Sequence, residues 1–181
     1  MDGALMGTND FHEDLEFSEK ASEEPFWQEV YKKAFHDLVF ANPTVGKMQG
    51  QFLGIDRVVY LKSGKVVFID EKKRRKVWDD IALEYKSNSN KNFNDGWMNK
   101  DLLIDYIAYA FMPTQTVYLL DWLSLKRVWK TKGIEWMKLA KNKKSGFRII
   151  SAPNYGYITM SVGVPIPVLL KEIAKPIIVS I

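Results

Sequence analysis

The sequence predicts a mixed α/β domain in which a central antiparallel hairpin belongs to a mixed sheet flanked by helices. Two β-rich runs, residues 55–61 and 65–72, are separated by Lys62-Ser63-Gly64, a glycine-closed loop typical of hairpins. Segments of helical periodicity lie before and after this hairpin. The 181 residues are 46% hydrophobic and 27% charged, which suits one globular domain with a sizeable core.

The first helix is expected to begin near Ser22, a good N-cap that is followed by two glutamates and a proline in the first turn. Apolar residues then recur at helical spacing and predict a face turned toward the core: Trp27, Val30, Tyr31, Ala34 and Leu38. Asn42-Pro43 is expected to end the helix, because this dipeptide favours a turn.

The later elements are predicted from shorter patterns. A third strand is expected at residues 81–85, a polar loop at 87–96 and an apolar helix at 102–112, stopped before Pro113. A short strand at 116–120 precedes helical sequence through about Leu139, and a basic loop covers 141–146. Two more strands are expected at 147–151 and 157–162, with a last short helix beginning near Pro165 or Pro167.

Charge divides the chain into two parts. Residues 1–24 contain eight acidic residues and one lysine, so they predict an acidic, flexible leader of net charge −7. Because the whole chain carries +4, residues 25–181, interpreted as a single domain, carry +11. A surface this basic favours a polyanionic partner, and we expect DNA.

Several kinds of site are disfavoured by what the sequence lacks. It has no cysteine, and its two histidines have no partners at metal-ligand spacing, so disulfides and zinc sites of these types are not expected. The sequence contains no glycine-rich phosphate-binding loop, so a nucleotide cofactor is not expected. No signal peptide and no apolar run long enough for a membrane helix is visible, so a cytoplasmic protein without membrane contact is expected.

The hairpin is the part of the sequence that predicts chemistry. If residues 62–64 form the loop, Leu61 pairs with Lys65, and continuing outward places Asp56 opposite Asp70. Lys72 lies two residues beyond Asp70 and therefore shares its face of the strand. Two carboxylates this close repel each other, and neighbouring apolar residues raise the cost by burying them. A divalent cation compensates, since Mg²⁺ is commonly held by one or two carboxylates and substrate phosphate oxygens.

These residues, in Gly54-Ile55-Asp56 and Ile69-Asp70-Glu71-Lys72, resemble the motif of the PD-(D/E)XK nuclease superfamily, which includes restriction endonucleases and archaeal-type Holliday-junction resolvases. The resemblance implies a restriction-endonuclease-like fold and hydrolysis of phosphodiester bonds with Mg²⁺, or Mn²⁺ as a substitute. Asp56 and Asp70 would bind the metal, and Lys72 would position or deprotonate the attacking water, or neutralise developing charge. The resemblance covers roughly residues 25–85.

Two departures from the family pattern bear on the site. Ile55 stands where the motif often has proline, and Asp70 stands where glutamate is commoner. Glu71-Lys72-Lys73 fits the acid-x-Lys pattern equally well, and a four-residue loop would place Glu71 opposite Asp56. The glycine-closed loop favours Asp70, while Glu71 stays open as a metal ligand through this register or its backbone. Family members also suggest an acid on the first helix, where Glu29 is the candidate.

Other residues are candidates for binding rather than chemistry. Asp56 and Asp70 are called the acidic pair below. Basic residues that follow this pair, or that lie in the later basic loop, are candidate phosphate contacts: Lys73, Arg74, Arg75, Lys76, Lys143 and Lys144. Glu84 is a candidate further ligand, and Trp78 and Trp97 are candidates for stacking on bases. The leading hypothesis is a magnesium-dependent endonuclease acting on DNA. A catalytically silent binding module of the same fold is the alternative, and a homodimer is left open.

Overall fold

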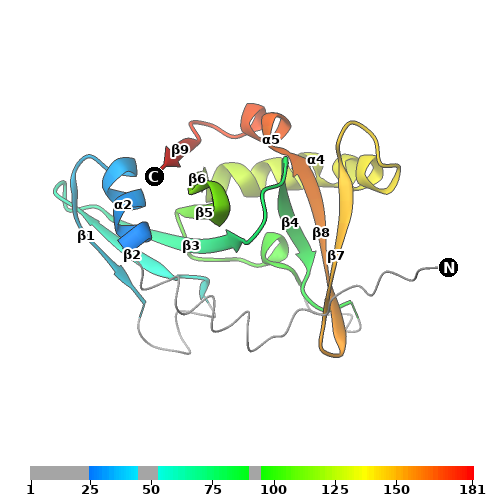
Figure 1. The fold of residues 1–181 in the computed structure, drawn as a ribbon, viewed down its shortest axis with the longest axis horizontal. Helices are drawn as coiled ribbons and strands as arrows, with labels where there is room; N and C mark the ends of the chain where they lie inside the picture. Colours follow the sequence, from blue (N-terminus) through cyan, green and yellow to red (C-terminus); the bar gives the residue numbers. More distant parts are fainter. Residues whose placement is uncertain (1–24, 45–52, 90–94) are drawn as a thin grey trace.

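The computed structural model describes residues 25–44, 53–89 and 95–181, so the acidic leader and the start of the first helix expected at Ser22 lie outside the described residues (Figure 1). The described part contains three α-helices and nine strands. In chain order they are α2 (Pro25–Ala34), β1 (Leu38–Pro43), β2 (Arg57–Leu61), β3 (Val66–Arg74), β4 (Asp80–Lys86), β5 (Tyr106–Phe111), β6 (Thr116–Asp121), α4 (Trp122–Lys141), β7 (Arg148–Asn154), β8 (Tyr157–Pro165), α5 (Ile166–Glu172) and β9 (Ile177–Ser180). The mixed α/β class predicted from the sequence is confirmed.

Six strands form a mixed sheet in the order β1-β2-β3-β5-β6-β9, and β4, β8 and β7 form a second, antiparallel sheet. The predicted hairpin is confirmed, because Tyr60 pairs with Val66 and Val58 pairs with Phe68 across β2 and β3. The loop closes through Leu61 N–H and Lys65 O, 3.0 Å apart, and Gly64 adopts the positive φ of 81° that glycine tolerates best. β3 then runs parallel to β5, which makes the sheet mixed.

Helix α2 covers one face of the six-stranded sheet. Its buried residues Trp27, Val30 and Tyr31 pack in one core cluster with inward-facing residues of β2, β3, β5, β6 and β9. On β3 these inward-facing residues are Val67 and Ile69, so odd-numbered positions of this strand face the helix.

The opposite face of the sheet is covered at its β5 and β6 end by α4 and the second sheet. A larger core cluster joins Ile107, Tyr109 and Leu120 of the first sheet to Leu83 of β4 and Trp136 of α4. In Figure 1, β3 runs from the α2 end of the molecule toward β4, and the sheet of β4, β8 and β7 stands beyond it. Among the described residues, no helix is long and apolar enough to cross a membrane.

The helix expected at residues 102–112 is wrong, because residues 106–111 form the strand β5. The run Tyr-Ile-Ala-Tyr-Ala-Phe is apolar at every position, and β5 is buried on both faces between the two core clusters. A strand covered on both sides loses the alternation that identifies strands in a sequence, so its pattern cannot be told from that of a buried helix.

Two further differences concern the edges of the large sheet. The first helix was expected to continue to Asn42-Pro43, but residues 38–43 form β1, an edge strand that ends at Pro43. Proline is tolerated there because an edge strand does not need every backbone N–H. Strand β9, at the other edge, was not predicted, although the β-branched run Ile177-Ile178-Val179 after Pro176 is a strand signal. The expected strands at 81–85, 116–120, 147–151 and 157–162, and both later helices, are confirmed within a few residues.

Candidate active site

Asp70 and Lys72 lie on the same face of β3, as the sequence predicts, and this face is opposite to the one that α2 covers. Their neighbours on the parallel strand β5 are Ile107 and Tyr109, which belong to the core beneath the second sheet. Asp70 is only 3% exposed, whereas the side chain of Lys72 is 32% exposed. The Lys72 ammonium donates to Asp70 Oδ1. The pair therefore consists of a buried carboxyl group and a more accessible ammonium group.

Asp56 joins this pair from the residue just before β2. Regular pairing of the hairpin ends at Arg57 and Ile69, and the Asp56 N–H also donates to Ile69 O, at 2.9 Å. Two consecutive residues thus face one partner, which is the pattern of a β-bulge. Asp56 is exposed, and its Oδ2 accepts the Glu71 N–H at 2.8 Å. The bulge explains why Asp56 lies beside Asp70 without being its regular cross-strand partner.

The surroundings of Asp70 disfavour its charged form. Burial raises the pKa of Asp70 most, and the Asp56 carboxylate raises it further by its charge and by a hydrogen bond between the two side chains. Lys72 opposes both effects, and the resulting pKa of Asp70 is about 7. Asp70 is thus close to half protonated at neutral pH, and added positive charge beside it would favour the carboxylate.

Lys72 is held in its charged form. Burial acts to lower its pKa, but the carboxylates of Asp70, Asp56 and Glu84 outweigh burial, and the pKa of Lys72 is raised. A lysine with a raised pKa is an ammonium ion at neutral pH. It is suited to neutralising negative charge and is a poor base for water.

Glu84 approaches the same lysine from β4. Its charge contributes to the raised pKa of Lys72, and its Oε1 accepts a hydrogen bond from the Ser87 hydroxyl at 2.6 Å. The second sheet therefore contributes an acid to the electrostatics of the site, which the sequence offered only as a candidate. Within the described ranges, no three side chains of the histidine, aspartate and glutamate types are grouped closely enough to hold a metal ion. The protein would supply two carboxylates to a cation here.

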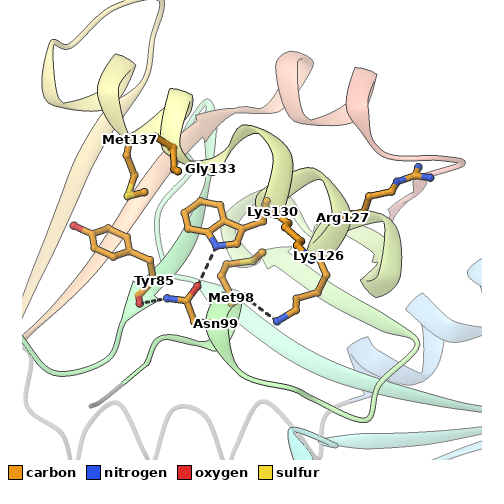
Figure 2. Close-up of a pocket in the computed structure, with 10 residues that line it drawn as sticks. Tyr85, Met98, Asn99, Lys126, Arg127, Lys130, Gly133 and Met137 are labelled. Carbon is orange, nitrogen blue, oxygen red and sulfur yellow. Dashed lines mark hydrogen bonds between the residues drawn. The ribbon is translucent and has the colours of Figure 1, made fainter. Parts of the chain in front are cut away.

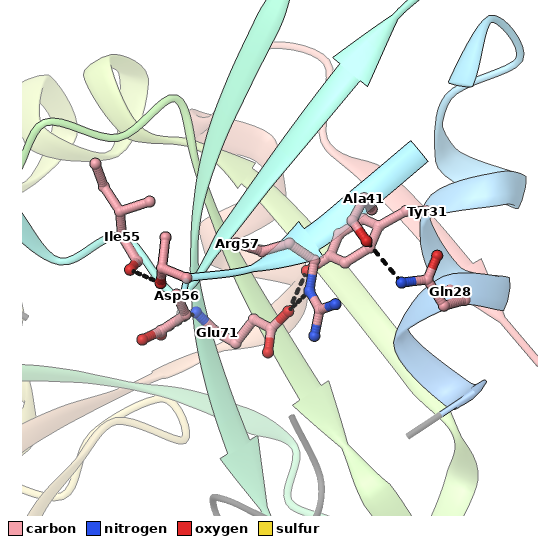
Figure 3. A network of polar contacts seen from close by, with 8 residues as sticks. Gln28, Tyr31, Ala41, Ile55, Asp56, Arg57 and Glu71 are labelled. Atoms are coloured by element: carbon pink, nitrogen blue, oxygen red, sulfur yellow. Dashed lines mark hydrogen bonds and ion pairs between the residues drawn. The ribbon is translucent and has the colours of Figure 1, made fainter. Parts of the chain in front are cut away.

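Glu71 points to the other face of β3, where it forms a buried network under α2 (Figure 3). Its Oε1 accepts from Arg57 Nε at 2.5 Å and from the Tyr31 hydroxyl at 2.8 Å. Burial raises the pKa of Glu71, and Arg57 opposes this effect. The four-residue hairpin loop that would place the Glu71 side chain opposite Asp56 is therefore wrong, and only the Glu71 backbone lies at the acidic pair.

Arg57 and Tyr31 were not identified as polar partners from the sequence. Arg57 is 1% exposed within the strand run Arg-Val-Val-Tyr-Leu, and Tyr31 was expected only as a core residue. A charged residue at an inward-facing strand position is a signal that a partner must be buried with it. Since Glu71 has the same parity on the paired strand, the register of the hairpin was sufficient to suggest this ion pair.

Glu29 is not brought to the acidic pair. It lies on α2, on the opposite side of the sheet from Asp70, and its carboxylate binds Lys32 at 2.6 Å with half of its side chain exposed. The expectation that the first helix contributes a ligand from this position is wrong for a geometric reason, because the sheet separates the two residues.

The chain matches no family model, no curated protein and no solved structure. Its chemistry therefore has to be inferred from the residues of the site.

The basic residues that follow Lys72 lie at the C-terminal end of β3 and just beyond it. Arg74 shares the face of Lys72, and its charge acts on the hydroxyl of Tyr109. Lys73 lies on the opposite face of the strand, and Arg75 and Lys76 are exposed just beyond its end. Lys143 and Lys144 lie elsewhere, on the exposed turn between α4 and β7, which Figure 1 shows far from β2. Four of the six predicted phosphate contacts thus lie next to the acidic pair in the chain.

The two tryptophans considered for stacking differ in their surroundings. Trp97 is 8% exposed and packs against Trp122 in the core, so the expectation that it is available to bases is wrong. Trp78 is 39% exposed, but the Arg148 guanidinium lies over its ring at 4.1 Å, and Arg148 is itself paired with Asp80. One face of the Trp78 ring is therefore already covered.

Proposed function

We propose that this chain is a metal-dependent nuclease of the PD-(D/E)XK type that hydrolyses phosphodiester bonds of DNA at Asp56, Asp70 and Lys72. The observation that carries the proposal is a buried aspartate whose pKa is raised to about 7 beside a second carboxylate and a charged lysine. Two neighbouring carboxylates destabilise a sheet, and strongly perturbed pKa values of this kind cluster at functional sites.

The two carboxylates suit Mg²⁺ or Mn²⁺. Both are hard oxygen ligands, and Asp56 is accessible from solvent. Burial raises the pKa of Asp70 most and repulsion from Asp56 adds to it; a cation would relieve this repulsion. When bound, the ion supplies a water nucleophile of lowered pKa and polarises the phosphate. The two carboxylates would leave most of its coordination positions to water and phosphate.

Each protein group then has a distinct part. Asp56 is fixed by the Glu71 N–H, at 2.8 Å, which orients its carboxylate toward the site. Asp70 is oriented by the Lys72 ammonium. Because the raised pKa keeps Lys72 protonated, its part is to stabilise the negative charge that develops on the phosphate rather than to remove a proton from water.

The test is cleavage of supercoiled plasmid in Mg²⁺. Asp70→Asn removes a ligand charge but leaves the basic surface, so nicking should fall by about 100-fold or more while DNA affinity changes by less than about threefold. Asp79→Asn, the same substitution at an exposed position, should cut as fast as the unchanged protein. EDTA should abolish cleavage. An Asp70→Asn variant that cuts normally would remove Asp70 from the site.

The alternative is a catalytically silent module that binds DNA or protein through the same fold. It is favoured by one observation, the absence of a third grouped metal ligand in the described part of the chain. The same experiment separates the two proposals, because the silent module shows no Mg²⁺-dependent nicking whether or not it binds the plasmid.

A further inference from the structure

A pocket of about 590 Å³ lies between α4 and the segment that joins β4 to β5, and the proposed reaction does not use it (Figure 2). Volumes of this size are typical of sites for small ligands. Its walls are aromatic and aliphatic, and its rim is basic. The residues that matter most are Tyr85, Asn99, Arg127, Trp129, Lys130 and Met137.

The indole of Trp129 is fixed at the side of this pocket. Its Nε1 donates to Asn99 Oδ1 at 3.1 Å, and Asn99 Nδ2 donates in turn to the Tyr85 carbonyl at 2.9 Å. Gly133, one helical turn beyond Trp129, gives the ring room, since a Cβ at this position would lie 3.0 Å from it. An aromatic ring held this way is ready to stack on a planar ligand without losing further side-chain freedom.

Asn99 also has hydrogen-bonding capacity to spare. A side-chain amide has two N–H donors and two acceptor lone pairs, and each polar atom of Asn99 makes one of the bonds above. One donor and one acceptor thus remain. Nucleobases present neighbouring donors and acceptors on their edges, and amide side chains are common partners for them.

The cations at the rim differ in their availability. The Lys126 ammonium is engaged by the carbonyls of Met98 and Lys100, at 3.2 and 2.9 Å, and has the exposed Asp101 carboxylate at 3.7 Å. Arg127 and Lys130 are exposed on the same helix. Neither side chain forms an ion pair with another described residue, so both can meet an anionic group that stands outside the pocket while a planar ring occupies it.

We propose that this pocket binds a nucleobase by stacking on Trp129 and hydrogen bonding to Asn99, with the attached phosphate held by Arg127 and Lys130. The ligand is either an unpaired base of a polynucleotide strand or a free mononucleotide, which present the same chemistry. This proposal goes beyond the nuclease site and does not require a metal ion.

The test is binding in EDTA, monitored through the NMR signal of the Trp129 indole N–H. The probes are AMP, adenosine, inorganic phosphate and a hexamer of deoxyadenosine. AMP and the hexamer should shift the signal, and adenosine should bind about three- to tenfold more weakly than AMP. Arg127→Glu with Lys130→Glu should weaken AMP binding by about tenfold. Lys138→Glu with Lys171→Glu, the same charge change at exposed residues outside the pocket, should stay within about twofold.

Trp129→Leu removes the NMR reporter, so its AMP binding is measured by isothermal titration calorimetry alongside the unchanged protein. It should be weaker by at least about fivefold, because the stacking surface for the base is lost. A hexamer that binds at least about tenfold more tightly than AMP identifies a strand as the ligand, and equal binding identifies a free nucleotide. The proposal is overturned if neither probe shifts the Trp129 signal at millimolar concentration, if inorganic phosphate competes as well as AMP, or if both double variants weaken binding equally. Asp70→Asn should bind AMP normally, so failure of the nuclease proposal would leave this result intact.

Discussion

Asp56 and Asp70 are chemically identical, but their surroundings separate them. Asp56 is exposed and accepts a backbone N–H, whereas Asp70 is 3% exposed and its pKa is raised to about 7. Lys72 keeps its proton because three acids act on it. One residue thus carries most of the electrostatic cost of the group, and that residue is the informative one to replace.

The stability of the metal-free protein should depend on pH through Asp70. With a folded pKa of about 7 against an ordinary 3.8, the folded protein binds a proton that the unfolded chain has released. The free energy of unfolding therefore falls as pH rises from about 4 to about 7, and stays low above that. Asp70→Asn lacks this loss. Relative to the unchanged protein, its stability should rise by roughly 1–2 kcal/mol between about pH 5.5 and about pH 8.5.

Urea denaturation in EDTA at the two pH values measures this difference. Asp79→Asn, an exposed control, should follow the unchanged protein at both. Parallel behaviour of Asp70→Asn and the unchanged protein would show that Asp70 titrates normally.

The acidic pair could be predicted from the sequence because it depends on one short-range relation, the hairpin register. Gly64 fixes the loop length, and the loop length fixes which residues of β2 and β3 are partners. The bulge at Asp56 and the approach of Glu84 depend on contacts between segments far apart in the chain. No local pattern encodes these contacts, so they became visible only in the structure.

At the scale of elements, β3 carries two separate polar clusters, one on each of its faces. Asp70 and Lys72 face the second layer, which consists of α4 and the sheet of β4, β8 and β7, while Glu71 between them faces α2. The Glu71 network ties the hairpin to the helix, although Glu71 Oε2 is buried with no hydrogen-bond partner among the described residues. The arrangement predicts that the two faces of one strand can be altered independently.

Breaking the Glu71 network should cost stability in a graded way. Tyr31→Phe removes one hydrogen bond to Glu71, at 2.8 Å, and should cost about 1–2 kcal/mol. Arg57→Ala leaves the Glu71 carboxylate buried without its cation and should cost about 3–5 kcal/mol. Chemical denaturation at neutral pH measures both. Equal losses would show that Arg57 is not the main partner of Glu71.

A related variant separates stability from chemistry. Glu71→Gln should lower the melting temperature because it disturbs the bond to Arg57, at 2.5 Å, yet nicking per folded molecule should stay within about threefold of the unchanged protein. The measurement is plasmid cleavage well below the melting temperature, with the folded fraction taken from circular dichroism. A loss as large as that of Asp70→Asn would return Glu71 to the list of metal ligands.

The elements that sequence reasoning misjudged share a physical cause. β5 is buried on both faces, and β1 follows a helix after a turn of only a few residues, so neither shows an alternating pattern long enough to recognise. Elements with a single exposed face, such as α4, were recognised because solvent imposes a period on their sequence. Burial by distant segments removes that signal.

At the scale of the whole molecule, the acidic pair lies where the second layer ends. Asp70 is 3% exposed, but Phe68, two residues earlier on the same face, is 36% exposed, as is Tyr60 on β2. The second layer covers the sheet as far as Asp70 and leaves the hairpin open. In the proposed reaction, an extended substrate would approach across this exposed surface beside Asp70.

The distribution of charge gives a last prediction. Residues 1–24 carry −7 and the remainder +11, so the leader should be attracted to the basic surface and compete with DNA. Deleting residues 1–21 should therefore tighten DNA binding at low salt. The gain should shrink as salt rises, because the Debye length falls to about 10 Å at 0.1 M.

A leader of unchanged length, with each Asp replaced by Asn, each Glu by Gln and Lys20 by Gln, separates charge from bulk. If the attraction is electrostatic, the protein with this neutral leader should bind DNA as tightly as the truncated protein at every salt concentration. Fluorescence anisotropy with a labelled duplex measures all three proteins at low and moderate salt. Equal affinities at low salt would show that the leader does not reach the surface that binds DNA, whereas tightening by the deletion alone would assign the competition to its bulk.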